Sequence, residues 1–100
     1  MIEVKNKDDK FYQFVVKSPS GKILLESVVF KDSKSLENTL TEIKDKNLPT
    51  KSFERKTNFD GQFLFNLKND QGTVIGSSGF YNSEAGMENG IKNLRNILEP

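Results

Sequence analysis

The sequence predicts an α+β fold made by internal duplication of a β3-α unit, with one antiparallel sheet and two helices packed on one face. Three observations lead to this fold class: self-similarity at an offset of 51 residues, runs with an apolar period of two, and two apolar stripes at helical spacing. A period of two is typical of half-buried strands, and spacing of three to four is typical of amphipathic helices. The length of 100 residues fits a single domain.

The duplication is visible when the chain is aligned with itself at that offset. Of the 49 aligned pairs, 10 are identical, where average residue usage gives about three. Apolar positions also match apolar positions, as in Leu24 with Ile75 and Leu36 with Met87. We therefore expect one domain over residues 1–100, built of repeat one (1–50) and repeat two (51–100).

Each repeat is predicted to contain three strands followed by a helix. The predicted strands cover residues 2–5, 11–17 and 22–30 in repeat one and residues 53–56, 62–68 and 73–81 in repeat two. Gly21 and Gly72 fall in the second turn of each repeat, where a positive φ is cheapest for glycine. The helices are predicted to begin at Asp32 and Ser83, which are good N-cap residue types.

The second predicted helix contains Gly86 and Gly90, each of which should cost about 1 kcal/mol relative to alanine. Their counterparts in repeat one are Ser35 and Thr39. These four positions form the small edge of the helices. One interpretation is close packing, in which the small edge contacts the other helix or the sheet and so the other repeat. The alternative is a ligand or a partner helix in the notch.

Alternation along the strands predicts which side chains lie on the sheet face away from the helices. Phe14, Phe63 and Phe65 are expected to face the helices. The opposite, open face is expected to carry four apolar side chains: Val15, Leu24, Leu64 and Ile75. A contiguous exposed patch of this kind often marks an interface, although scattered exposed apolar groups are normal. Both interpretations of the four residues remain open.

The composition excludes several kinds of chemistry. The chain has no cysteine and no histidine, so thiolate sites and the commonest general base are absent. A net charge of +1 gives no global electrostatic reason to bind nucleic acid or an anionic membrane. No acidic metal-binding motif and no phosphate-binding loop occur. We expect no enzyme activity, no cofactor and no metal.

The segment from Gly72 to Asn96 resembles the YegP-like family of small bacterial proteins of unknown function. The residues that carry the resemblance are a turn glycine, a serine and an aromatic residue after a strand, and a helix motif: Gly72, Ser78, Tyr81, Asn89-Gly90-Ile91 and Lys92. Repeat one has Phe30 in place of Tyr81 and Asn38-Thr39-Leu40 in place of the helix motif. Any role of the hydroxyl or the glycine therefore belongs to repeat two.

The resemblance implies tandem β3-α units that form one continuous sheet, with strands exchanged between the units and both helices on one face. It also implies that single-repeat relatives reach this arrangement as dimers, so we expect this tandem form to be a monomer. The family's activity is not established, and the resemblance implies none.

We expect a non-catalytic binding or interaction module that works through the open sheet face or the helix pair. Its partner is expected to be an unknown protein or small ligand, and not a membrane or nucleic acid. The N-terminus lacks the apolar region of a signal peptide, so we expect a cytoplasmic location. Single-stranded nucleic-acid binding is the alternative, and it requires aromatic rings on the open face.

Overall fold

The computed structural model describes residues 1–8, 10–45 and 48–98, and it contains six strands, two α-helices and one short 3-10 helix. In chain order these are β1 (Ile2–Lys7), β2 (Phe11–Lys17), β3 (Ile23–Ser27), α1 (Ser33–Asp45), η1 (Thr50–Ser52), β4 (Phe53–Thr57), β5 (Phe63–Lys68), β6 (Val74–Ser77) and α2 (Glu84–Leu98). The fold is α+β, as predicted, with a six-stranded antiparallel sheet and two helices.

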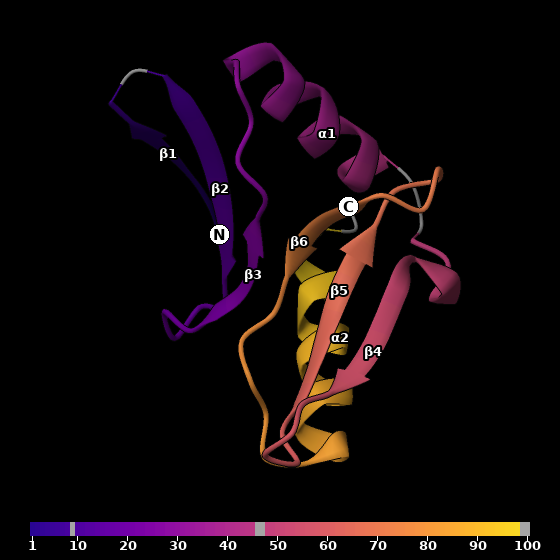
Figure 1. Cartoon of the computed structure of the whole chain (residues 1–100). Helices are drawn as coiled ribbons and strands as arrows, with labels where there is room; N and C mark the ends of the chain where they lie inside the picture. The colour runs from indigo at the N-terminus through magenta and orange to yellow at the C-terminus, as the bar shows by residue number, and fades with distance from the viewer. Residues whose placement is uncertain (9, 46–47, 99–100) are drawn as a thin grey trace.

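The sheet has the strand order β1-β2-β3-β6-β5-β4, so each half of the chain contributes three adjacent strands (Figure 1). The implied exchange of strands between the halves is therefore wrong. Among the described strands, the halves pair where β3 lies beside β6, through the pairs Glu26 with Ser77 and Ser27 with Gly76. The N–H of Val28 also donates to the oxygen of Ile75 over 3.0 Å. Two residue pairs are few for a junction between the two halves of one sheet. Contacts of the helices must therefore help to hold the halves together.

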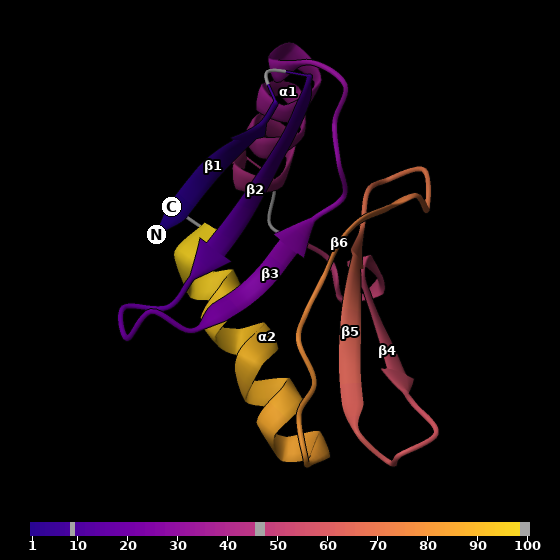
Figure 2. The same ribbon diagram turned by 60° about the vertical axis from the view of Figure 1, so that its left-hand side comes forward.

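Both helices pack on one face of the sheet and share a single core. This core includes side chains from both halves: Phe14, Val16, Leu25, Leu36, Ile43, Phe65, Leu67, Met87, Ile91 and Leu94 are among its members. Helix α2 contacts β3 of the first half as well as β5 of its own half. Figure 2 shows α2 crossing the sheet beneath β3. This helix therefore bridges the junction that the strands alone join weakly.

The helices begin where the cap residues predict. The backbone N–H of Ser35 donates to the carboxylate of Asp32 over 2.7 Å, and that of Gly86 donates to the hydroxyl of Ser83 over 3.0 Å. These side chains satisfy first-turn donors that have no partner within the helix. The predicted helix boundaries therefore follow from local capping chemistry.

Side-chain contacts of α2 fix it relative to β4 and to the segment that precedes η1. Arg55 of β4 donates two hydrogen bonds to the carboxylate of Glu88. Near the other end of the helix, Arg95 donates to the backbone oxygen of Leu48 over 2.6 Å and lies 4.8 Å from the ring centroid of Phe53. The helix is thus held at both ends.

The third strand of each half is shorter than predicted because a serine interrupts it. The hydroxyl of Ser27 accepts the backbone N–H of Phe14 and donates to the oxygen of Val28. Ser78 makes the same pair of bonds in the second half, with Phe65 and Gly79. Each hydroxyl takes the place of a backbone partner, and the regular ladder ends there.

A β-bulge in each half changes which residues of the third strand are buried. The register shifts between Val16 and Lys17, which leaves Leu24 as an extra residue, and a second shift leaves Ile75 extra. Strict alternation would put both side chains on the open face, but an extra residue in a bulge breaks that alternation. Leu24 and Ile75 instead belong to the core, and their predicted place on the open face is wrong.

The strand junction predicts a strong effect of adding a methyl group at Gly76. A Cβ atom at this position would lie 3.0 Å from Cγ of Leu25 and 3.1 Å from the backbone oxygen of Glu26. We expect Gly76→Ala to lower the free energy of unfolding by about 1–3 kcal/mol, because the junction would be overpacked. The measurement is urea unfolding followed by circular dichroism.

Gly79→Ala is the matched control, because a Cβ atom at Gly79 would meet nothing within 4 Å. Its expected change lies within about 0.5 kcal/mol of zero. Equal destabilisation by both variants would contradict a tight junction.

Candidate functional site

A cleft of about 510 Å³ lies between the turn after β2 and one face of α2. Its residues come from both halves of the chain: the turn belongs to the first half and the helix to the second (Figure 2). This volume is typical of small-molecule sites, which usually span about 300–1,000 Å³. The cleft is therefore the candidate site for a small ligand.

The wall formed by the turn is well ordered by its own hydrogen bonds. Gly21 adopts a φ of 90°, and its N–H donates to the backbone oxygen of Ser18. The hydroxyl of Ser18 accepts the N–H of Lys22 over 3.2 Å and lies 2.8 Å from the hydroxyl of Ser20. The turn thereby presents Lys22 at the cleft from a fixed backbone.

The wall formed by α2 contains three asparagines and two glycines. Asn89, Asn93 and Asn96 line the cleft at spacings of four and three residues, which places them on one helical face. Gly86 and Gly90 also line it and leave the helix backbone close to the open space. The result is a recess bordered by three hydrogen-bonding amides.

Tyr81, in the loop between β6 and α2, lines the cleft with an unsatisfied polar group. Its side chain is 7% exposed, and its hydroxyl is the one buried side-chain polar atom among the described residues without a hydrogen-bond partner. The ring stacks against Phe65 with the centroids 6.5 Å apart. Burial raises the pKa of this hydroxyl above 10.0, so it remains a protonated donor at neutral pH.

Lys22 is the charged side chain of the cleft. Its ammonium nitrogen lies 4.5 Å from the ring centroid of Tyr81, in a cation–π contact. None of the described residues that line the cleft is acidic. The cleft therefore combines one positive charge with the hydroxyl of Tyr81 and neutral amides.

The two glycines of the small edge lie closest to side chains of their own half of the chain. A Cβ atom on Gly90 would lie 2.2 Å from the hydroxyl oxygen of Tyr81, so this glycine makes room for a side chain of its own half. At Gly86 the nearest atoms belong to Ser83 and Tyr81. Ser35 is exposed and Thr39 is half-buried on α1. The predicted close packing is therefore present at Gly90, and its neighbour is Tyr81, which forms a bridge with Phe63 of β5. The expected contact of the glycines with the other repeat is wrong, and both glycines also border the cleft.

Sequence reasoning missed Lys22, Asn93 and Asn96, and it considered the hydroxyl of Tyr81 only as part of a family motif. One signal was present in the sequence. The tyrosine and the glycine occur together in the second half of the chain, where the first half has Phe30 and Thr39 at the positions 51 residues earlier. The hydroxyl of Tyr81 reaches the helix backbone and therefore requires glycine at position 90. Phe30 has no hydroxyl, so a larger residue, Thr39, is tolerated at the corresponding helix position.

Polar side chains cover much of the open face of the sheet, where Phe11 and Ile23 are also exposed. Val15 pairs across the sheet with Glu3 and Glu26, and Leu64 pairs with Lys56, so both lie on this face. Val15 is nevertheless fully buried and Leu64 is half-buried, because long side chains of this kind cover apolar neighbours with their methylene groups. The expected exposed patch of Val15, Leu24, Leu64 and Ile75 is therefore wrong.

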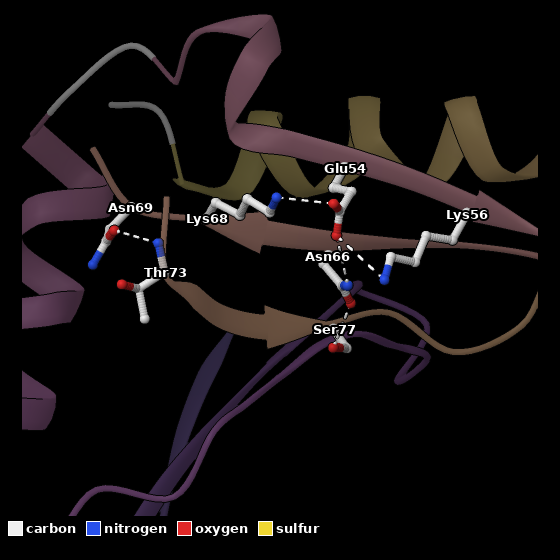
Figure 3. A network of polar contacts seen from close by, with 7 residues as sticks. All are labelled: Glu54, Lys56, Asn66, Lys68, Asn69, Thr73 and Ser77. Carbon is white, nitrogen blue, oxygen red and sulfur yellow. Dashed lines mark hydrogen bonds and ion pairs between the residues drawn. The ribbon is translucent and has the colours of Figure 1, made fainter. Parts of the chain in front are cut away.

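A network of polar contacts occupies the second half of this face (Figure 3). Lys68 donates to the carboxylate of Glu54 over 2.8 Å, and Asn66 donates to it over 3.2 Å. Ser77 in turn donates to the amide oxygen of Asn66, and Lys56 lies 3.6 Å from Glu54. The bonds from Lys68 and Asn66 lower the pKa of Glu54 to about 2. The polar groups of this network therefore serve as hydrogen-bond partners for one another.

Three of the rings that a nucleic-acid stacking platform could use lie on the other face, whereas Phe11 of β2 is exposed on the open face. Phe14 and Phe65 are fully buried in the core, and Phe63 packs against it, as predicted. On the open face the described strands therefore lack these three rings as stacking surfaces.

The part of the chain that the structure describes shows neither a cluster of metal-ligating side chains nor a membrane-spanning helix. No cluster of three or more acidic side chains is placed to hold a metal ion. Neither helix, as far as it is described, has the length and apolar character to cross a membrane.

The fold is that of a class of small α+β proteins with a six-stranded antiparallel sheet, and two solved structures share this architecture. The solution structure of YegP from Escherichia coli, titled a protein of unknown function, superposes with a TM-score of 0.84 at 29% identity, covering 94% of this chain and 81% of that one. A UPF0339 protein from Shewanella oneidensis gives a TM-score of 0.87 at 23% identity, covering 95% and 80%. The second likeness shows the fold alone.

Sequence comparison agrees with the structures. A UPF0339 protein of Acinetobacter baylyi is 33% identical over 94% of this chain and 85% of its own length. The family model described as "Domain of unknown function (DUF1508)" matches residues 59–97. The chain belongs to the UPF0339 (YegP) family of small bacterial proteins, whose function is not known.

The network around Glu54 predicts how stability changes in acid. The pKa of Glu54 is lower in the folded protein than its usual 4.5, so its contribution to stability is present above pH 4.5 and is lost as the pH falls toward 2. We expect Glu54→Gln to lower the urea midpoint at pH 6 and to have a steadily smaller effect between pH 4.5 and 2. Glu37→Gln on α1 is the control, and an equal pH dependence in both variants would contradict the prediction.

The unsatisfied hydroxyl predicts that Tyr81→Phe makes the protein more stable. A buried polar group without a partner costs about 1–3 kcal/mol, and phenylalanine keeps the ring contact with Phe65 while removing that cost. We expect the free energy of unfolding to rise by about 1 kcal/mol, measured by urea unfolding. Tyr12→Phe, in β2, is the control, and a marked loss of stability on Tyr81→Phe would show that the hydroxyl is already satisfied.

Proposed function

We propose that this chain is a non-catalytic binding protein and that the cleft between the β2–β3 turn and α2 receives a small ligand. The sequence led us to expect binding through the open sheet face or the helix pair, and this proposal assigns it to the cleft on the helix side of the molecule. The observation that carries it is the hydroxyl of Tyr81, which is buried at the cleft without a hydrogen-bond partner. A buried polar group of this kind is usually satisfied in proteins, so its retention needs an explanation.

Gly90 also supports the proposal, because it lowers the stability of α2 next to the hydroxyl of Tyr81. Glycine in a helix costs about 1 kcal/mol relative to alanine, and here it admits the hydroxyl of Tyr81. Phenylalanine with a larger helix residue would avoid both penalties, as Phe30 and Thr39 do in the first half. Binding sites commonly keep such unfavourable local choices because function requires them.

We further propose that residues 1–50 and 51–100 are duplicated repeats and that the protein acts as a cytoplasmic monomer. Support for the duplication comes from features that recur 51 residues apart, including the hydroxyl bonds of Ser27 and Ser78 and the bulges in both halves. In a monomer, one cleft would be formed by the turn of repeat one and the helix of repeat two.

The test is an NMR titration of the ¹⁵N-labelled protein with a fragment library that contains neutral, cationic and anionic compounds. We expect some fragments to shift the backbone signals of Gly86 and Gly90 and the side-chain amides of Asn89, Asn93 and Asn96. Fragments that shift only signals on the open face, or no signals at all, would overturn the proposal.

A matched pair of variants separates the cleft from the rest of α2. Asn93→Trp fills the cleft, whereas Lys92→Trp adds the same ring at an exposed neighbouring position that does not line it. We expect the first variant to abolish the fragment-induced shifts and the second to preserve them. Equal responses would show that the fragments bind elsewhere.

A further inference from the structure

We propose that the ligand of this cleft carries a single carboxylate, which binds between the ammonium of Lys22 and the hydroxyl of Tyr81. This inference rests on the proposed function and names the chemical class that the site selects. Both groups are hydrogen-bond donors at neutral pH. Because the ammonium lies over the ring that bears the hydroxyl, one anionic group is able to contact both.

The charge of the cleft favours a monoanion. Lys22 supplies one positive charge, and the other described lining residues are uncharged. No carboxylate among the described residues forms an ion pair with Lys22. A carboxylate would match this single charge, whereas a phosphate dianion would leave one charge unpaired. The cleft extends along α2 from Gly86 in the first turn to Ile97 near the end. The N–H of Gly86, a helix N-terminal donor of the kind that stabilises phosphates, is already bonded to the hydroxyl of Ser83.

The position of Lys22 indicates how the hydroxyl becomes available. In the structure the ammonium rests on the ring of Tyr81, and the hydroxyl lies against Gly90 with no partner. Lys22 is exposed and belongs to a turn, so its side chain is able to move without disturbing the core. An anion draws the ammonium off the ring and reaches the hydroxyl, and it replaces a cation–π contact with charge-assisted hydrogen bonds.

The rest of the cleft defines the remainder of the ligand. The amides of Asn89, Asn93 and Asn96 both donate and accept hydrogen bonds, so they suit a neutral polar group such as an amide or hydroxyl. Leu24 and Ile97 add apolar surface to the same cleft. A carboxylate, an amide and a short aliphatic group occur together in N-acylated amino acids and at the C-terminus of a peptide.

The experiment compares acids with their neutral amides. The first pair is N-acetyl-leucine and N-acetyl-leucinamide, and the second is a leucine-terminated hexapeptide with a free or an amidated C-terminus. In NMR titrations at pH 7 we expect each binding acid to bind about tenfold more tightly than its amide. Binding of the acetylated amino acid alone identifies a free small molecule as the source, and tighter binding of the peptide acid identifies a chain terminus.

Three variants test the roles of the two donors. We expect Lys22→Gln to weaken binding of the acid about tenfold and to leave the affinity for the amide unchanged. Tyr81→Phe is expected to weaken acid binding about fivefold although it stabilises the protein. Lys34→Gln, on α1 and outside the cleft, is the charge-matched control and should change neither affinity.

The outcomes separate this inference from the proposed function. Equal binding of acid and amide at the cleft, or an unchanged acid affinity in Lys22→Gln, overturns the carboxylate and leaves the cleft as a binding site. The same conclusion follows if neither acid binds at about 20 mM while neutral or cationic fragments shift the cleft signals. Failure of every fragment would instead overturn the proposed function.

Discussion

The structure depends on a narrow junction between β3 and β6, which join the halves through two residue pairs. Gly76 allows this close approach, because any side chain at that position would meet Leu25 and the backbone of Glu26. So short a ladder leaves much of the cohesion to side-chain packing. Helix α2 supplies it by contacting β3 and β5 at once, and the single core that results includes side chains of both halves.

The bridging position of α2 also explains why a cleft forms. A helix that reaches across to β3 comes beneath the turn that leads into that strand, and the turn is held away from the helix by its own hydrogen bonds. The space between them is bordered by Lys22 on one side and by the amide face of α2 on the other. The cleft is therefore a consequence of how the halves are joined and is not contained in either half alone.

Much of the fold could be predicted from the sequence, because its signals are local. Asp32 and Ser83 fix the helix starts through caps, and the apolar periods identify the strands and the buried helix faces. Leu24 and Ile75 could not be placed, because a bulge changes the facing of one residue and depends on pairing with a neighbouring strand. The polar cover over Val15 likewise comes from side chains of other strands.

The candidate site was harder to predict because its parts are distant in the sequence. Lys22 lies just before β3 and Tyr81 lies after β6, so the antiparallel pairing of these two strands brings them together. Nothing in either local sequence indicates the other. The asymmetry between the halves was nevertheless present in the sequence. Packing of the fold alone would allow phenylalanine at position 81 and a larger residue at position 90. The first half has such residues, Phe30 and Thr39, at the corresponding positions. The second half instead keeps a hydroxyl without a partner and the glycine that admits it, and packing alone gives no reason for that pair.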